Sequence, residues 1–489
     1  MKNREISIDV LRGLAIVGMV LSGTISRNAD LPAWLYHAQI APPDFVFNPA
    51  LPGITWVDLV FPFFLFAMGM AFPFSLNRSL ERGTSYTSIL GKTALRALKL
   101  FAFAVMLGHL SPFHYPQEMG WLRYALGMVA FGGFFLAFAR FPQLSRHESK
   151  LNLAGFALLV LLLVARVHLF GLSFSIHRND IIILVLANMA LFGAAIWLFT
   201  RSNGYARLGI MALYFALRLT HGIDDSWNKM LWDFTPFKWM AASFPALYDS
   251  LLTLGVDLKR TIFYNPEYLK YLMIVIPGSI AGDIVYKGIQ EKVAHGKNTG
   301  ETIYTLLPWV LLTCISINLW GLLSRNLSVV WLANIATALF LGWSVHKSII
   351  KQHKQLCLLL SWSVFWLLLG LVFEAWQGGI KKDSATISYF FLTSGLAGFS
   401  IVIFRLWEPL FRPGRLLGFN TLTGMNPMLG YVAAAYLVMP VLYMLQILPW
   451  MDLWHTHQPW WGVLRGVLLT TLAIVVTMLS VKRKYFWKT

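Results

Sequence analysis

His37 and Asp58 are the two ionisable side chains of this sequence that are best placed to do chemistry together. Both lie in the segment "WLYHAQIAPPDFVFNPALPGITWVDLVFPFFLF", with His37 in its polar half and Asp58 where the apolar run begins. Histidine exchanges protons near neutral pH, and a carboxylate that orients the imidazole would make it a competent general base. Asp58 alone has a structural alternative, because a carboxylate in the first turn of a helix complements the helix dipole. The pair therefore predicts either a proton-transfer site or a helix terminus.

Other charged residues lie at the ends of apolar runs, where burial is expensive and usually has a reason. Asp9 and Arg12 are three residues apart and share a helix face, which predicts a local ion pair at the start of the first run. Arg96 and Lys99 lie near the inner end of a later run and serve either as anchors or as contacts for phosphate. Arg123 lies just inside the outer end of its run, where snorkelling to the interface is the alternative to a substrate contact.

The composition is that of an integral membrane protein. The chain has 489 residues, of which 57% are hydrophobic and 13% charged, whereas soluble domains are about a quarter charged. The net charge of +18 is explained by basic residues in cytoplasmic loops, so we expect no nucleic-acid partner. Cys314 and Cys357 both lie in apolar runs, which excludes a disulfide framework and a zinc cluster, and we expect no metal site.

Fourteen apolar runs are long enough to be considered as membrane spans, each needing about 20 apolar residues. They lie near residues 8–26, 56–76, 93–111, 120–139, 151–166, 181–200, 208–222, 268–286, 302–322, 329–346, 356–373, 387–404, 427–448 and 461–481. The loops on the N-terminal side of these spans hold 23 lysines and arginines, and the opposite loops hold 9. Basic residues favour the cytoplasm, so both termini are predicted to be cytoplasmic and the loop with His37 to face outward.

The fold class predicted is an all-α polytopic membrane protein with 11–14 transmembrane helices and a best count of fourteen. Backbone groups in lipid must be satisfied internally, and runs of this length and uniformity do not fit barrel strands. We expect one transmembrane domain over residues 1–489.

A resemblance to a known family rests on several motifs. The stretch "SIDVLRGLAIVGMVL", a loop containing histidine and then "GITWVDLVFPFFLFAMG" resemble the heparan-α-glucosaminide N-acetyltransferase family and its bacterial relatives. Further similar segments are "WLRYALGMVAF", "KKDSATISYFFLTSGLA" and "GMNPMLGYV". The family has an asparagine at the end of its first span, where this chain has Ser22 with Asn28 nearby, and the loop here carries an additional "APPDFVFNPALP".

The resemblance implies a transmembrane acyltransferase that moves an acetyl group from cytosolic acetyl-CoA to an amino sugar or glycan outside. His37 matches the family's catalytic histidine, as general base or as the group that is itself acetylated. Asp58 would hold its imidazole, and Asn426 would donate an amide N–H to the carbonyl oxygen. The remaining assignments are Arg12, Arg96 and Lys99 for the CoA phosphates, and Arg123, Asp224 and Trp227 for the acceptor.

Two alternatives stay open at this point. A chain with many spans and buried polar groups could be a transporter or flippase for an envelope glycan or sugar precursor. The same fold could instead transfer acyl groups to hydroxyls of exported polysaccharide. In each case we expect a multi-pass protein among membrane lipids, of the bacterial inner membrane and with a homodimer possible.

Overall fold

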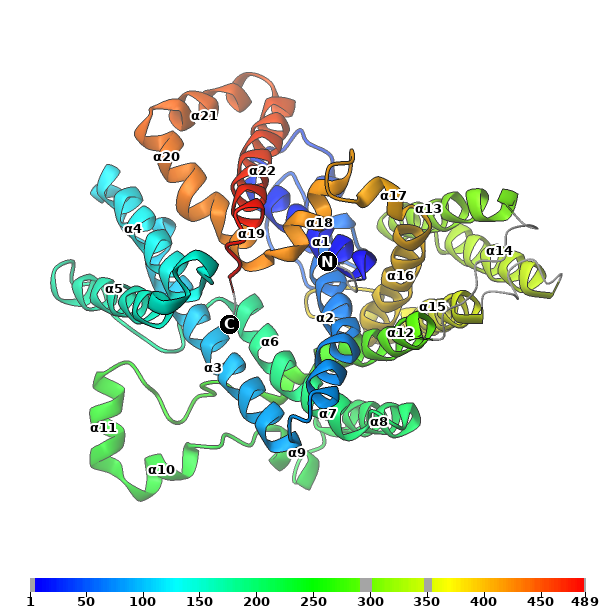
Figure 1. Ribbon diagram of the computed structural model, residues 1–489, viewed down its shortest axis with the longest axis horizontal. Helices are drawn as coiled ribbons and strands as arrows, with labels where there is room; N and C mark the ends of the chain where they lie inside the picture. Colours follow the sequence, from blue (N-terminus) through cyan, green and yellow to red (C-terminus); the bar gives the residue numbers. More distant parts are fainter. Residues whose placement is uncertain (1–4, 291–300, 347–353, 488–489) are drawn as a thin grey trace. The chain divides into compact units, whose positions relative to one another are not determined.

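The fold is built from helices throughout the described part of the chain (Figure 1). The computed structural model describes residues 5–290, 301–346 and 354–487. Within these ranges the only extended pairing is a single antiparallel bridge between Ala139 and Trp487. The predicted all-α polytopic class is therefore confirmed.

Two compact units make up the chain, and each gathers stretches that are far apart in the sequence. The first comprises Met1–Asn77, Met273–Tyr431 and Pro449–Val481. The second comprises Arg78–Leu272, Val432–Leu448 and Lys482–Thr489. Neither unit is a continuous segment, and the single domain over residues 1–489 stays a prediction.

The helices divide between the two units. Those wholly or mostly in the first are α1 (Ile6–Thr24), α2 (Trp56–Glu81), α12 (Leu272–Gln290), α13 (Glu301–Leu323), α14 (Leu327–His346), α15 (Lys354–Val372), α16 (Ile387–Leu406), α17 (Glu408–Phe411), α18 (Gly418–Met425), α19 (Pro427–Ala433), α21 (Ile447–His457) and α22 (Pro459–Lys482). Those of the second are α3 (Tyr86–Leu110), α4 (Trp121–Phe138), α5 (Glu148–His168), α6 (Ile181–Asn188), α7 (Ala194–Phe199), α8 (Gly204–Thr220), α9 (Trp227–Trp232), α10 (Lys238–Ser243), α11 (Pro245–Thr253) and α20 (Met439–Met444). The π-helical segments Met189–Gly193 and Ala434–Val438 join α6 to α7 and α19 to α20.

Twelve helical segments of the described residues are long and apolar enough to cross a membrane. They correspond to twelve of the fourteen predicted spans, a number within the predicted range of 11–14 and two below the best count. The predicted span 93–111 falls on α3, which carries Lys92, Arg96 and Lys99 along its first half. The predicted span 208–222 falls on α8, which has 17 residues.

Helix α16 forms the centre of the first unit, because every residue of it from Ile387 to Phe404 is buried. Its small residues let α15 approach closely, as is common between membrane helices. A Cβ placed on Gly395 would lie 2.6 Å from the backbone nitrogen of Leu367, and one on Gly398 would lie 2.1 Å from Oγ of Ser363. The same closeness joins α1 to α18, where a Cβ on Gly424 would lie 1.8 Å from the carbonyl oxygen of Asp9.

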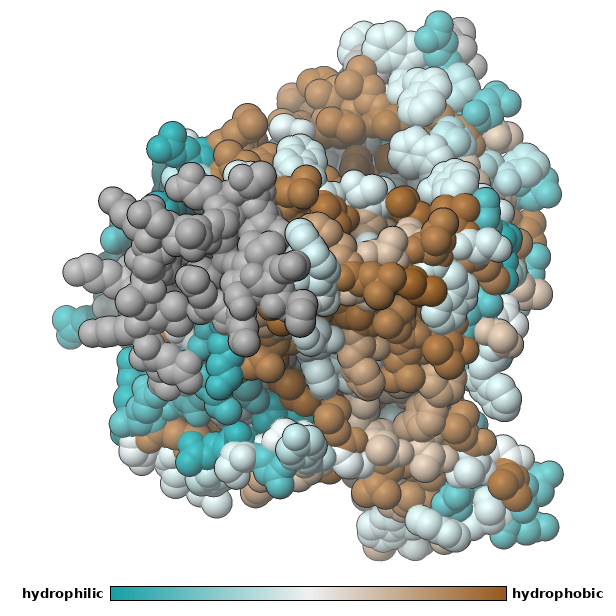
Figure 2. Space-filling model, turned by 90° about the vertical axis from the view of Figure 1, so that its right-hand side faces the viewer, coloured by the Kyte–Doolittle hydropathy of each residue, from teal (hydrophilic) through white to brown (hydrophobic). Residues whose placement is uncertain are grey.

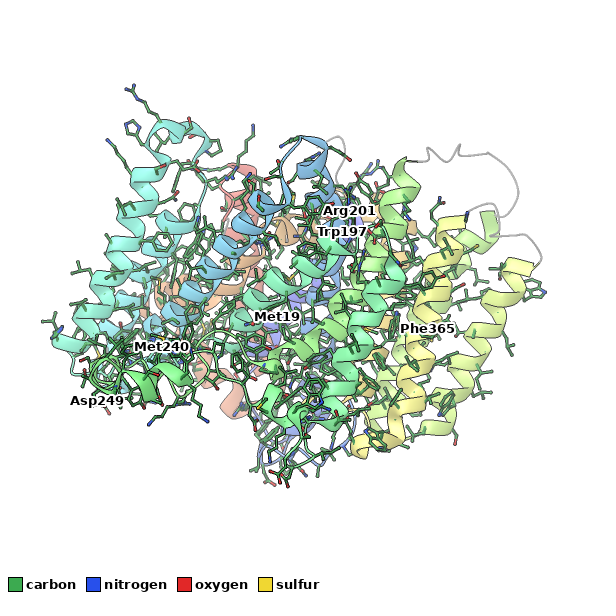
Figure 3. The ribbon with its side chains drawn as sticks, turned by 90° about the horizontal axis from the view of Figure 1, so that it is seen from below. Met19, Trp197, Arg201, Met240, Asp249 and Phe365 are labelled. Carbon is green, nitrogen blue, oxygen red and sulfur yellow. The ribbon has the colours of Figure 1, made fainter. Side chains whose placement is uncertain are left out.

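The first unit has an exposed apolar face of the kind that suits contact with lipid. Figure 2 shows a broad apolar band across the face on which α13 and α14 lie. Exposed large apolar side chains there include Trp320 on α13 and Leu339 on α14. Phe365 on α15, labelled in Figure 3, is 50% exposed. Since water would oppose such a surface, this band is suited to face the hydrocarbon of a bilayer.

Candidate functional site

The loop between α1 and α2 is folded against the end of α1 and holds His37 in place. Its apolar side chains Leu31, Leu35 and Tyr36 pack with Ile25 in one buried cluster. The hydroxyl of Tyr36 donates to the carbonyl oxygen of Ser26 at 2.7 Å. His37 thus follows directly after an anchored residue, and its backbone position is fixed by its neighbours.

Asp58 lies in the first turn of α2 and helps to cap that helix. Thr55 precedes α2, and its backbone N–H donates to Oδ2 of Asp58 at 2.9 Å. The hydroxyl oxygen of Thr55 in turn accepts from the N–H of Val57 at 3.2 Å. This reciprocal arrangement is a capping box, in which the side chain three residues into the helix binds back to the capping residue. The structural alternative for Asp58 is therefore present in the fold.

The second oxygen of Asp58 binds the histidine. Oδ1 lies 2.7 Å from Nδ1 of His37, and Oδ2 also accepts from the N–H of Ala38 at 3.3 Å. The Asp58 side chain is fully buried, whereas that of His37 is 30% exposed. A carboxylate on Nδ1 fixes the tautomer with its proton on that nitrogen, which leaves Nε2 with a free lone pair. The hydrogen bond expected between His37 and Asp58 is present, and the role of the pair in catalysis stays a prediction.

Another buried histidine shows what a structural imidazole looks like in this chain. His109, at the end of α3, is fully buried. Its Nδ1 donates to the carbonyl oxygen of Val105 at 2.8 Å, and its Nε2 accepts from the N–H of Ser175 at 3.2 Å. Both ring nitrogens are occupied by backbone groups, so His109 has no lone pair for a substrate. His37 differs because a carboxylate binds one nitrogen and the ring is partly open.

Lys382 is a member of this site that the sequence interpretation did not assign. Its Nζ lies 3.1 Å from Nδ1 and 3.2 Å from Nε2 of His37. It lies in the loop between α15 and α16, at the start of the segment "KKDSATISYFFLTSGLA" and 345 residues further along the chain than His37. The sequence contained a clue, because Lys381 and Lys382 are adjacent in a loop predicted to face outward, where lysine pairs are rare.

The loop that carries Lys382 is tied to the loop that carries His37. The N–H of Gly53 donates to the carbonyl oxygen of Ile380 at 2.8 Å. The hydroxyl of Tyr389, in the first turn of α16, donates to the backbone carbonyl of Asp58 at 2.6 Å. These bonds join α2, α16 and their two preceding loops into one framework around the imidazole.

Asn426 lies elsewhere in the first unit. It directly follows α18, and its Nδ2 lies 3.4 Å from Oγ of Ser480. The neighbouring Gly424 approaches the backbone of Asp9 and Gly13, in the first half of α1, whereas the loop with His37 packs at the other end of that helix. The two ends of the 19-residue helix α1 are about 27 Å apart at 1.5 Å per residue. The structure therefore does not bring Asn426 to His37.

The residues predicted to meet donor phosphates have separate surroundings. Arg12 in the first unit forms an ion pair with the buried Asp9, as the spacing of the two residues predicts. Arg96 and Lys99 lie on α3 of the second unit, with Arg96 exposed and Lys99 half-buried. Their assignment to CoA stays a prediction.

The three predicted acceptor residues lie in the second unit. Arg123 donates to the hydroxyl of Tyr124 at 3.1 Å, and its guanidinium lies over that ring. Trp227 is 69% exposed and lines a surface hollow with Ser226 and Met230. Asp224 pairs with Lys229, whose hydrogen bond lowers the pKa of the Asp224 carboxyl. A role for these residues in binding an acceptor stays a prediction.

Comparison with known proteins gives two kinds of match. The sequence profile of the family described as "Domain of unknown function (DUF5009)" matches residues 4–258. The chain is also similar to heparan-alpha-glucosaminide N-acetyltransferase of Homo sapiens, with 32% identity over 101 residues that cover 21% of this chain and 13% of that protein. The Mus musculus protein of the same name is 32% identical over 105 residues, covering 22% of this chain and 14% of that protein. The match thus spans a small part of the length of these relatives.

Proposed function

We propose, from the premise that this chain belongs to the DUF5009 family, that it is a membrane acyltransferase whose reaction takes place at His37. The partial similarity to the N-acetyltransferases supports membership of a membrane acyltransferase family. The observation that carries the proposal is the 2.7 Å contact of Asp58 with Nδ1 of a histidine that is still 30% exposed.

The proposed donor is acetyl-CoA and the proposed acceptor is an amino sugar or a glycan that bears one. In direct transfer, Nε2 of His37 takes a proton from the acceptor ammonium, and the freed nitrogen lone pair attacks the thioester carbonyl carbon. The carbon–sulfur bond then breaks and sulfur leaves with the bonding pair. The imidazolium gives its proton to the thiolate, and the nitrogen of the new amide releases its remaining excess proton to water. Asp58 stabilises the imidazolium while it carries that proton.

A covalent route uses the same residues. Here Nε2 attacks the thioester carbon, the carbon–sulfur bond breaks, and an acetyl-imidazole forms on His37. The acceptor amine then attacks the acetyl carbon, and the bond to Nε2 breaks with its pair returning to the ring. Incubating the protein with labelled acetyl-CoA without an acceptor separates the routes, because only the covalent route leaves label on His37.

The proposed orientation places both termini in the cytoplasm and His37 outside, following the basic residues of the loops. The donor would then reach the site from the cytoplasmic side and the acceptor from the other. Arg12, Arg96 and Lys99 are proposed for the CoA phosphates because guanidinium and ammonium groups bind phosphate oxygens by charge-assisted hydrogen bonds. Localisation in a bacterial inner membrane belongs to this proposal.

The test is transfer by the purified protein in detergent. Acetyl-CoA is supplied with glucosamine, its oligosaccharides and a hydroxyl-bearing glycan, and CoA release is followed together with the mass of the product. We expect acetylation of an amine, and His37→Ala to lower the rate by about 10²-fold or more, the order expected for a lost general base. His168→Ala removes an exposed histidine at the end of α5 and serves as the matched control. Wild-type turnover in His37→Ala would refute the assignment.

A further inference from the structure

The position of Lys382 relative to the ring of His37 can be derived from two distances. Nζ lies 3.1 Å from Nδ1 and 3.2 Å from Nε2, so it is nearly equidistant from both nitrogens. The two nitrogens flank Cε1, and a point in the ring plane at these distances from both would overlap ring carbon atoms. The ammonium therefore lies over the face of the imidazole.

This placement leaves the in-plane positions of both nitrogens open. Nδ1 uses its in-plane direction to contact Asp58 at 2.7 Å. The lone pair of Nε2 also lies in the ring plane, and Lys382 does not stand in its path. A substrate atom can therefore approach Nε2 while the ammonium stays beside the reacting centre.

Lys382 is held there by its loop. Its neighbour Lys381 donates its backbone N–H to Oγ1 of Thr386 at 3.1 Å and accepts from the N–H of Thr386 at 3.1 Å. Ile380, on the other side, accepts from Gly53. The lysine therefore extends from a closed turn that is fixed to the framework of the site.

Lys382 forms no direct ion pair with an acidic side chain. Among the described residues, the contacts of its Nζ go to His37, and the imidazole separates the ammonium from the Asp58 carboxylate. Arg325, near the same loop, is by contrast paired with Glu374 at 2.7 Å. The ammonium over the imidazole is therefore available to a negative charge that develops during reaction.

We propose that Lys382 is a further catalytic residue, whose ammonium donates a hydrogen bond to the acyl oxygen as it becomes an oxyanion. This inference rests on the proposed acyl transfer at His37. When the attacking nitrogen bonds to the carbonyl carbon, the π pair moves onto oxygen, and the pair returns when the carbon–sulfur bond breaks and sulfur leaves with its electrons. Lys382 keeps its proton throughout and supplies only electrostatic stabilisation.

The test compares Lys382→Met with Lys382→Arg in the acetyl-CoA assay. Methionine keeps an unbranched apolar stem and removes the charge, whereas arginine keeps the charge. Loss of one oxyanion donor lowers kcat by about 10²–10³-fold. We therefore expect that drop in Lys382→Met, with KM for acetyl-CoA unchanged within about threefold and kcat partly restored in Lys382→Arg. Lys150→Met, which removes an exposed lysine in the first turn of α5, is the matched control and keeps the wild-type kcat.

The outcomes separate this inference from the proposed function. No CoA release by the wild-type protein with any acceptor overturns both. An active wild type with Lys382→Met at a similar kcat overturns the role of Lys382 alone. A kcat of Lys382→Arg that is no higher than that of Lys382→Met also overturns it, since the positive charge would then make no difference to the rate. Melting temperatures of the three variants within a few degrees of wild type show that they are folded, and Lys382→Gln replaces methionine if that variant unfolds.

Discussion

Replacing Asp58 by asparagine separates its two functions. In the native site, Oδ2 accepts from the N–H of Thr55 at 2.9 Å and Oδ1 lies 2.7 Å from Nδ1 of His37. Both partners approach as N–H donors when His37 has its proton on Nδ1. Asparagine has one acceptor oxygen and one NH₂ group of similar size. One of the two donors must therefore face an NH₂ group, which cannot accept.

The size of the effect follows from the charge of the lost acceptor. Hydrogen bonds to charged groups contribute about 1.5–3 kcal/mol. If the bond to His37 is the one lost, and if it acts fully in the transition state, kcat falls by about 10- to 150-fold, because 1.36 kcal/mol corresponds to a factor of ten. The stability also falls, by about 1–3 kcal/mol, because a donor is left without an acceptor beside a fully buried side chain.

The assay measures acetyl transfer at saturating donor for wild type and Asp58→Asn, with a melting curve for each. We expect a lower maximal rate, because the imidazole loses the partner that orients it and stabilises the imidazolium. Asp180→Asn is the matched control, since Asp180 caps α6 through the N–H of Ile183. A melting temperature that falls while the rate stays as in wild type would show that Asp58 is only a helix cap.

Three further predictions concern the orientation and the packing. With the two native cysteines replaced by serine, Arg82→Cys should resist an impermeant thiol reagent added outside and Asp249→Cys should react; the opposite pattern would reverse the proposed orientation. Burial and nearby arginines lower the pKa of the His114 imidazole, so the unfolded chain binds more protons than the folded chain as the pH falls through the ordinary histidine range, and the free energy of unfolding decreases. Between pH 8 and pH 5.5 the melting temperature of His114→Gln should therefore fall less than that of wild type. Equal decreases would contradict this. Gly395→Val should lower the stability by about 1–3 kcal/mol as an overpacked interface with Leu367, measured by thermal unfolding, and an unchanged melting temperature would refute the close contact.

The membrane fold could be predicted well from sequence because hydropathy and length determine it directly. Two predicted spans are not among the twelve candidates, and the reasons are local. The apolar run at 93–111 belongs to the longer helix α3, whose first half carries Lys92 and Arg96, and the run at 208–222 belongs to a helix of 17 residues. The division into two interleaved units could not be read from the sequence, since it depends on packing between helices that hydropathy does not encode.

Sequence analysis could predict those contacts of the site that join residues close together in the chain. His37 and Asp58 are 21 residues apart, and the capping box of Thr55 with Asp58 is a pattern within one turn. Lys382 joins them through tertiary folding alone. Asn426 was assigned from its motif. The helix before it, α18, packs against the first half of α1 through glycines that allow close backbone contact.

The two oxygens of Asp58 explain why its structural and chemical interpretations were hard to separate by sequence. One oxygen completes the capping box of α2, and the other fixes the histidine. The cap therefore also fixes where the carboxylate stands, while Tyr389 holds the same turn from α16 by donating to the Asp58 carbonyl. Because α16 follows the loop of Lys382, one helix contact helps to place both the carboxylate at Nδ1 of the imidazole and the ammonium over the ring face. A site built this way needs no movement of charged groups when the oxyanion forms, which is the condition under which fixed charges lower a barrier most.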